Sequence, residues 1–308
     1  MPEPIPTTLP AQDLAVRTRG LTKRYGRVEA VTGLDLTVPE GAFYLLLGPN
    51  GAGKTTTFRM LMGMLRPTSG SAEVAGVATS PGGQVRARMG FVPEHQDGPY
   101  GWMRTGDLIR HHAGYFPAWN DAYARRLADA FELRPDVRYG ELSKGQARRV
   151  QLLMALAHTP PVLLLDEPTD GLDPVARDTV QAILAEHLAE YPTTVIVATH
   201  LVYEMERFAD YVGVLGAGRL VAQVERATLQ AQLRRYVLDV AEDWHPQLEA
   251  ELPLLRQNGT PRERRWTIWG AEEDVTRRLT SAGANVRSVS ALNLDEAALA
   301  LLSRKEDR

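Results

Sequence analysis

The sequence predicts an α/β fold in which helices cover a parallel sheet, followed by a smaller α+β module. Between Leu14 and about Val221, three short apolar runs, 43–47, 162–165 and 195–198, alternate with longer segments of helical periodicity. Such runs are typical of strands that are buried on both faces of a parallel sheet. With 308 residues, 44% of them hydrophobic, the chain can form two domains with separate cores.

Proline is concentrated at the N-terminus, where residues 1–12 contain four of the twenty prolines, and we expect a flexible leader there. The first domain is predicted to span residues 13–225, with a helical insert rich in Arg, Ala and Leu at about 98–158. A helical stretch around 225–235 would lead out of it. Residues 236–308 are called the accessory module here.

The accessory module is expected to contain two strands and two amphipathic helices, at 236–240, 266–269, 272–279 and 295–302. Trp266 and Trp269 lie an odd number of positions apart, so a strand would point them to opposite faces. We therefore favour core packing or a dimer contact over an aromatic ligand site. No ligand-binding motif is recognisable in this module.

Composition excludes several classes of function. The net charge is −3 with both signs interspersed, so we expect no nucleic-acid partner, and we interpret the short basic run Arg262–Arg265 as a solvated loop. The absence of cysteine excludes disulfides, thiol catalysis and cysteine-ligated zinc. No run approaches the roughly 18 apolar residues of a membrane helix, and no signal peptide is recognisable, so a cytoplasmic location is expected.

A phosphate-binding loop follows the first apolar run. The motif G-x-x-x-x-G-K-[ST] is matched by Gly48, Pro49, Asn50, Gly51, Ala52, Gly53, Lys54 and Thr55. Its backbone N–H groups would converge on phosphate oxygens, Lys54 would neutralise charge, and Thr55 would offer its hydroxyl to Mg²⁺. A glycine-rich turn with an incidental lysine is the alternative, but the flanking strand and helix favour nucleotide binding.

Two acidic residues follow the run 162–165. Asp166 is predicted to hold Mg²⁺ through water, and Glu167 to polarise the water that attacks the γ-phosphate. His200 ends the next apolar run and would contact the γ-phosphate from the same sheet edge. His111 and His112 are neighbours on a helix without a third ligand, so we expect them to be solvated or packed.

The segment Leu142-Ser143-Lys144-Gly145-Gln146 resembles the LSGGQ signature of ATP-binding cassette (ABC) ATPases, the nucleotide-binding subunits of ABC transporters. Ser143 and Gln146 also have the spacing of a helix capping box. Over residues 14–222 the family's elements occur in the family's order: an aromatic, the phosphate loop, the signature, LLLDEP, GLDP and a terminal histidine. The resemblance implies a P-loop NTPase cassette with a RecA-like core that hydrolyses ATP with Mg²⁺.

The resemblance also implies that two cassettes, as a homodimer or a heterodimer, meet head to tail. Each ATP would lie between the phosphate loop of one chain and the signature of the other. It further implies roles for individual residues: adenine stacking for Tyr25, ATP binding for Gly48 to Thr56, contact with the partner's ATP for Ser143, Lys144, Gly145 and Gln146, the dimer-interface loop for Asp173, and γ-phosphate sensing for His200.

Two positions depart from the family pattern. The lid glutamine that ligates Mg²⁺ aligns with Glu94, while the nearest glutamine is Gln96, and either is a candidate ligand. Lys144 replaces a glycine of the signature and would place a cation near the partner's phosphates. We expect Lys144 to leave activity intact, whereas a carboxylate at Glu94 would add negative charge beside Mg²⁺.

Variants of this kind, and a C-terminal pattern such as Asn293-Leu294-Asp295-Glu296, resemble cassettes of the ABC-2 exporter type. The resemblance implies a separately encoded transmembrane permease and a peripheral location on the inner face of the membrane. Gly98–Met103 would either dock that partner or pack on its own helical insert. A soluble ABC ATPase acting on nucleic acid or ribosomes is the alternative, although the chain has one phosphate loop and no sustained heptads.

Overall fold

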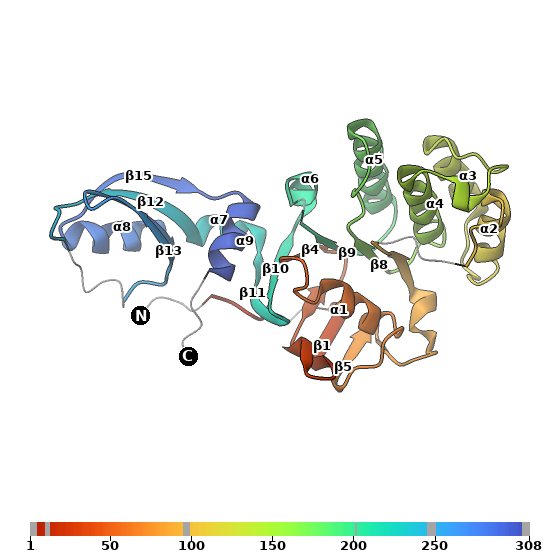
Figure 1. The fold of residues 1–308 in the computed structure, drawn as a ribbon, viewed down its shortest axis with the longest axis horizontal. Coiled ribbons are helices and arrows are strands. Elements are labelled where there is room, and N and C mark those ends of the chain that lie inside the picture. Colours follow the sequence, from red (N-terminus) through yellow and green to blue (C-terminus); the bar gives the residue numbers. More distant parts are fainter. Residues whose placement is uncertain (1–4, 10–12, 95–98, 201, 245–250, 304–308) are drawn as a thin grey trace.

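The computed structural model describes residues 5–9, 13–94, 99–200, 202–244 and 251–303. Figure 1 shows the accessory module at one end of an elongated molecule and the helical insert at the other, with the main sheets between them. None of the helices in the described ranges is long and apolar enough to span a membrane.

The central sheet has six strands in the order β11-β10-β4-β9-β8-β7. Their bounds are β4 Phe43–Leu47, β7 Met89–Val92, β8 Val162–Asp166, β9 Thr194–Thr199, β10 Tyr211–Gly216 and β11 Arg219–Glu225. All neighbours are parallel except β10 and β11, which form a hairpin. The predicted runs are confirmed as β4, β8 and β9, and every residue of these three strands is buried.

A second sheet, which the sequence analysis did not predict, contains antiparallel strands in the order β2-β1-β5-β6, with β3 paired to β1. Their bounds are β1 Leu14–Tyr25, β2 Val28–Leu34, β3 Thr37–Pro39, β5 Ser69–Val74 and β6 Val77–Ala78. Register shifts interrupt the pairing of β1 with all three of its neighbours. These bulges break the apolar alternation that would have revealed the strands. One core, which includes Val16, Phe58 and Ile196, joins elements of both sheets.

The helices of the first domain are α1 Lys54–Leu61, α2 Thr105–Ala113, α3 Asp121–Ala130, α4 Lys144–Leu156, α5 Pro174–Glu190 and α6 Val202–Met205. Short 3₁₀ helices span 84–88, 139–141 and 206–208. The predicted helical insert contains α2, α3 and α4. The predicted capping box begins α4: Gln146 N donates to Ser143 Oγ at 3.2 Å, and Ser143 N donates to Gln146 Oε1 at 3.0 Å.

The accessory module contains an antiparallel sheet in the order β13-β14-β12-β15. Its elements, with the linking helix, are α7 Arg226–Gln232, β12 Leu233–Asp239, β13 Leu254–Gly259, β14 Glu263–Trp269, α8 Glu272–Ser281, β15 Asn285–Ala291 and α9 Leu294–Leu302. Trp266 packs with Leu279 of α8, whereas Trp269 belongs to the main core of the first domain. The two tryptophans are buried in different cores, which agrees with the prediction that they point to opposite faces of the strand.

The two ends of the described chain both pack on the first domain. Helix α9 contacts β10, β11 and α6, and a Cβ added to Gly216 of β10 would lie 2.8 Å from Leu302 Cδ2. The sequence analysis placed this helix within the accessory module, but the helix also packs on the first domain. Ile5 is also buried in the main core, and Pro6 O accepts a hydrogen bond from Gln223 N at 2.8 Å. Ile5 and Pro6 therefore contact the first domain, whereas residues 1–4 and 10–12 of the predicted leader lie outside the described residues.

Candidate active site

The phosphate loop connects β4 to α1, as predicted. Gly53 has φ of 102°, and a Cβ there would lie 2.5 Å from Ala30 O, so only glycine fits this position. Lys54 Nζ donates to Gly48 O at 2.7 Å and to Pro49 O at 3.2 Å. Burial lowers the pKa of Lys54, and the nearby carboxylates of Glu167 and Asp166 oppose that shift. The loop therefore folds around a buried ammonium group.

A cavity of about 320 Å³ brings the loop together with three acidic residues. It is lined by Ala30, Asn50, Gly51, Ala52, Gly53, Lys54, Thr55, Thr56, Glu94, Asp166 and Glu167. The parallel register explains this meeting, because Leu47 pairs with Thr199 and Asp166 pairs with Ala198 at the same sheet edge. Sequence-distant motifs thus form one site.

Asp166 has the properties of a Mg²⁺ ligand. It is 1% exposed, and its Oδ2 atom has no hydrogen-bond partner among the described residues. Burial raises the pKa of Asp166 to about 6, although a hydrogen bond with Thr55 and the charge of Lys54 lower it. An orphaned carboxylate oxygen beside a threonine hydroxyl fits a hard divalent cation that also binds phosphate and water oxygens. No group of three or more His, Asp or Glu in the described ranges forms a metal site by itself.

Glu167 is held by the end of β9. Its carboxylate accepts hydrogen bonds from Thr199 Oγ1 at 2.9 Å and from His200 N at 3.0 Å, and His200 Nδ1 lies 2.8 Å from Oε1. Its φ of 50° lies in the left-handed region that residues other than glycine rarely adopt. His200 was predicted to contact the nucleotide; the structure places it against Glu167, with its side chain 50% exposed. Thr199 was not singled out from the sequence.

Glu94 lines the cavity, as one of the two lid candidates should, whereas Gln96 lies outside the described residues. Arg148 of α4 holds the lid: its Nη2 donates to Glu94 O at 2.7 Å, and its Nη1 donates to Pro93 O. Arg148 is completely buried, and burial lowers its pKa. The sequence analysis did not single out Arg148. The signal was its position four residues before Leu152, on the same buried face of α4.

None of the four signature residues lines the cavity of their own chain. Lys144 Nζ binds Asp170 Oδ2 at 2.6 Å, so the lysine charge is compensated in part within the chain. Asp173 caps α5 by accepting from Ala176 N at 2.9 Å, and this bond lowers the pKa of Asp173. The predicted contacts of these residues with a second chain stay predictions.

Tyr25 ends β1, where it is 49% exposed and lies outside the cavity lining. Lys23 Nζ lies 5.1 Å from its ring centroid. Adenine stacking on Tyr25 therefore stays a prediction.

Both predicted outcomes occur: His111 is exposed, and His112 is partly buried. His111 lies against Tyr100 and Tyr115, and His112 lies against Phe116 and Trp119. Burial lowers the pKa of His112 to about 4, which keeps it neutral at physiological pH.

Comparison with known proteins gives the same family along nearly the whole chain. Residues 31–170 match the family model described as ABC transporter. The chain is 36% identical over 310 residues to the daunorubicin/doxorubicin resistance ATP-binding protein DrrA of Streptomyces peucetius, covering 95% of this chain and 94% of that protein. It is 36% identical over 230 residues to the Nod factor export ATP-binding protein I of Burkholderia orbicola, covering 72% and 75% of the two chains.

Solved structures share the fold. A solved ATP-binding subunit of an ABC transporter superposes with a TM-score of 0.64 at 25% identity, covering 70% of this chain and 92% of that one. A dimeric bacterial ABC transporter cassette superposes with a TM-score of 0.61 at 24% identity, covering 68% and 98%. The predicted P-loop NTPase cassette is confirmed, and the chain belongs to the ATP-binding proteins of ABC transporters, a family of ATPases.

Proposed function

We propose that this chain is the ATP-hydrolysing subunit of an ABC-2 type exporter. The observation that carries the proposal is the single cavity in which the phosphate loop meets Asp166 and Glu167. The names of two relatives, a drug-resistance ATP-binding protein and a Nod factor export ATP-binding protein, support export as the coupled process.

In the proposed reaction, backbone N–H groups of the loop and Lys54 hold the triphosphate of ATP. Thr55 and Asp166 would hold Mg²⁺, which would supply positive charge to the phosphate oxygens. Glu167 accepts a proton from the water that attacks the γ-phosphorus; the bond from that phosphorus to the bridging oxygen breaks, and ADP and inorganic phosphate leave. Thr199 and His200 hold the Glu167 carboxylate in place. The side chain that accepts the proton is therefore oriented before water arrives.

The function test is the substitution Glu167→Gln, which keeps the shape of the side chain and removes its basicity. We expect ATP hydrolysis to fall on the order of 10² to 10⁴-fold, the usual contribution of a general base, while ATP binding persists. Glu190→Gln, an exposed carboxylate of α5, is the control. Full turnover by the Glu167→Gln protein would remove Glu167 as the base.

We propose that a second cassette completes the site with its Ser143, Lys144, Gly145 and Gln146, because these residues lie outside the cavity of their own chain. Mixing two inactive variants tests this arrangement. Lys54→Ala disables the loop, and Ser143→Arg blocks the signature, but a mixed dimer contains one intact loop facing one intact signature. We expect the mixture to recover ATPase activity that neither variant has alone. No recovery on mixing would contradict a shared site.

We further propose that an apolar groove binds a cytoplasmic helix of the permease. The groove, of about 540 Å³, lies between the core and the helical insert, and its lining includes Met64, Phe91, Tyr100 and Tyr115. Methionine and aromatic side chains are typical of interface cores. Pro99 and Tyr100 of the predicted docking segment also line it, whereas Gly98 lies outside the described residues.

Purification of the tagged chain from native membranes tests the choice of partner. We expect a multi-span membrane protein to co-purify and to raise ATP turnover. Tyr115→Arg, at a residue 66% exposed, should abolish that stimulation and leave basal turnover unchanged, whereas Leu299→Arg, at an exposed position of α9, should leave both unchanged. Recovery of ribosomal or DNA-associated partners alone would favour the soluble ABC ATPase instead.

A further inference from the structure

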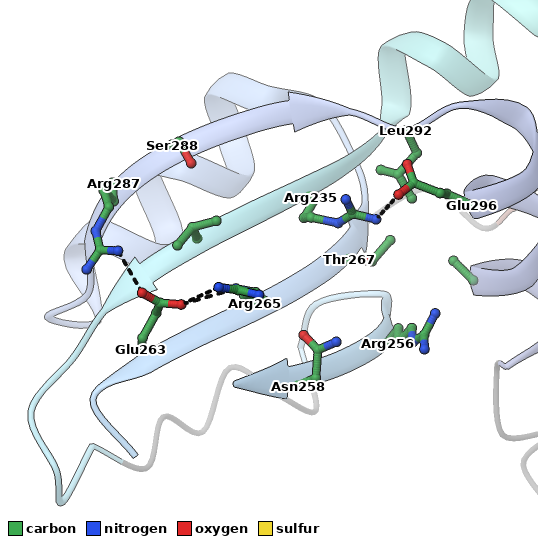
Figure 2. Close-up of a pocket in the computed structure, with 12 residues that line it drawn as sticks. Arg235, Arg256, Asn258, Glu263, Arg265, Thr267, Arg287, Ser288, Leu292 and Glu296 are labelled. Carbon is green, nitrogen blue, oxygen red and sulfur yellow. Dashed lines mark hydrogen bonds and ion pairs between the residues drawn. The ribbon is translucent and has the colours of Figure 1, made fainter. Parts of the chain in front are cut away.

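The sheet of the accessory module has one covered and one open face. Helix α8 covers one face, where Tyr236 and Trp266 of the sheet pack with Leu279 of the helix in a small core. The opposite face carries a cavity of about 500 Å³ that ends against α9 and shares no residue with the phosphate-loop cavity. Figure 2 shows Arg287, Glu263 and Arg265 joined at one end of the cavity, and Arg235 reaching Glu296 of α9 at the other. Neither the proposed ATPase cycle nor the permease groove uses this cavity.

Each of the four strands contributes one arginine to this cavity: Arg235 from β12, Arg256 from β13, Arg265 from β14 and Arg287 from β15. The acidic residues of the lining are Glu263 and Glu296, and Asp239 beside the lining binds Arg287, so four positive charges meet three negative ones. Glu263 pairs with both Arg265 and Arg287. The whole chain has a net charge of −3, which makes this cationic surface a local feature. A cavity with excess positive charge attracts anions.

A β-bulge adds one of the four arginines. Val237 pairs with Ser288 and Leu238 pairs with Val286, which leaves Arg287 as the extra residue of β15. Consecutive strand residues normally point to opposite faces, but Arg287 and Ser288 both line the cavity. The bulge thus turns an additional guanidinium toward the open face.

The middle of the cavity contains unused hydrogen-bond donors. Arg235 and Arg256 both pair with Thr267, so they flank it on the two neighbouring strands. Thr267 is 5% exposed, and no hydrogen bond within the described part of the chain involves its hydroxyl. Arg256 has no ion pair or hydrogen bond to any described side chain, and Arg235 uses only Nη2, which binds Glu296 at 2.8 Å. Two guanidinium groups and a buried hydroxyl are thus available to one acceptor.

We infer that the accessory module binds a small organic anion whose phosphate or carboxylate group lies over Thr267, between Arg235 and Arg256. Guanidinium groups hold such groups by charge-assisted, often bidentate hydrogen bonds. Val237, Leu292 and Ala300 provide an apolar wall for a compact organic body. The same chemistry is presented by a free organic phosphate and by the headgroup of an anionic lipid.

Calorimetric titration of phenyl phosphate into the full chain tests the site. The protein is first saturated with Mg·ADP, so that the phosphate loop is filled and does not bind the probe. A parallel experiment measures flotation with phosphatidylcholine vesicles that contain phosphatidylglycerol. We expect Arg256→Gln and Thr267→Val each to weaken binding about tenfold, which corresponds to one charge-assisted hydrogen bond.

Arg264→Gln is the matched control, because it removes the same charge from the neighbouring position of Arg265, on the face toward α8. Saturable binding of phenyl phosphate that Arg256→Gln weakens and Arg264→Gln preserves identifies a free anion. The same pattern with vesicles alone identifies a lipid headgroup. Equal weakening by both arginine variants, or no saturable binding of either probe, would overturn the inference. ATPase activity should be unchanged in all three variants, so the result is independent of the proposed hydrolytic function.

Discussion

Asp166 is a candidate Mg²⁺ ligand whose ionised carboxylate is buried, which is unfavourable for folding. Its carboxylate is buried at the end of β8, and burial raises its pKa to about 6 from an ordinary value of 3.8. An acid whose pKa is raised by folding destabilises the folded state at pH values above that raised pKa, and the cost disappears below the unfolded value. Two pKa units correspond to about 3 kcal/mol. The site is therefore expected to cost stability at neutral pH.

Asp166→Asn is expected to raise the free energy of unfolding at pH 7.5 by up to about 3 kcal/mol and to abolish Mg²⁺-dependent hydrolysis. The stability gain should shrink as pH falls through 6 and should vanish below about pH 3, where the wild-type carboxyl is neutral in both states. Urea unfolding in Mg²⁺-free buffer at several pH values measures it. An Asp166→Asn variant that is less stable than wild type at pH 7.5 would contradict this prediction, because it would show that Lys54 and Thr55 stabilise the buried carboxylate by more than burial costs.

The lid ligand is decided by a pair of substitutions. Because Glu94 lines the cavity, we expect Glu94→Gln to change the Mg²⁺ concentration that gives half-maximal ATPase activity, by about tenfold. Gln96→Ala is the comparison. If Gln96→Ala shifts the Mg²⁺ dependence and Glu94→Gln does not, Gln96 is the ligand.

At the scale of elements, Arg148 joins the lid to α4, the helix that begins at the signature. Its two hydrogen bonds hold the carbonyl groups of Pro93 and Glu94, so a shift of α4 would move the lid toward or away from Asp166. The helix that begins at the signature and the proposed Mg²⁺ site are thus connected within one chain by the buried side chain of Arg148.

Arg148→Met tests this connection, because methionine fills much of the space without donating hydrogen bonds. We expect the Mg²⁺ requirement for hydrolysis to rise about tenfold while the affinity for ATP changes little. The neighbouring Arg149 donates to Phe131 O at 3.3 Å and not to the lid, so Arg149→Met is the control. Identical kinetics of the two variants would contradict a specific role for Arg148.

The sequence predicted the elements that are buried on both faces and the motifs that are contiguous. Strands β4, β8 and β9 are continuous apolar runs, whereas bulges obscure β1 and its partners. The phosphate loop and the acidic pair were predicted for the same reason. Arg148 was missed because only helix packing brings it to the lid. Arg265 was interpreted as part of a solvated loop, but it lies in β14, and the four arginines of the accessory module meet only through strand register, which no local pattern encodes.

At the scale of the whole molecule, α9 ties the accessory module to the ATPase core. Leu301 is 1% exposed in the main core, whereas Leu299 on the same helix is 55% exposed. Substituting either leucine by alanine changes the helix propensity equally, but only the substitution at Leu301 removes a buried side chain.

Leu301→Ala is expected to lower the free energy of unfolding by about 3 kcal/mol, the usual cost of removing a buried leucine side chain. Leu299→Ala should change it by less than about 0.5 kcal/mol. Thermal unfolding monitored by calorimetry measures both, and Mg·ADP should raise the unfolding temperature of both variants. Equal stability of the two variants would show that α9 does not contribute to the core.

The packing of α9 on the β10–β11 hairpin also affects how the chain matures during synthesis. The hairpin forms the edge of the central sheet, and α9, which packs on it, is translated after every residue of the nucleotide site. Until then a nascent chain with a complete phosphate loop exposes apolar surface next to an open strand edge, which favours aggregation. Chains released before α9 is made should therefore depend on chaperones, even though every residue of the nucleotide site has been translated.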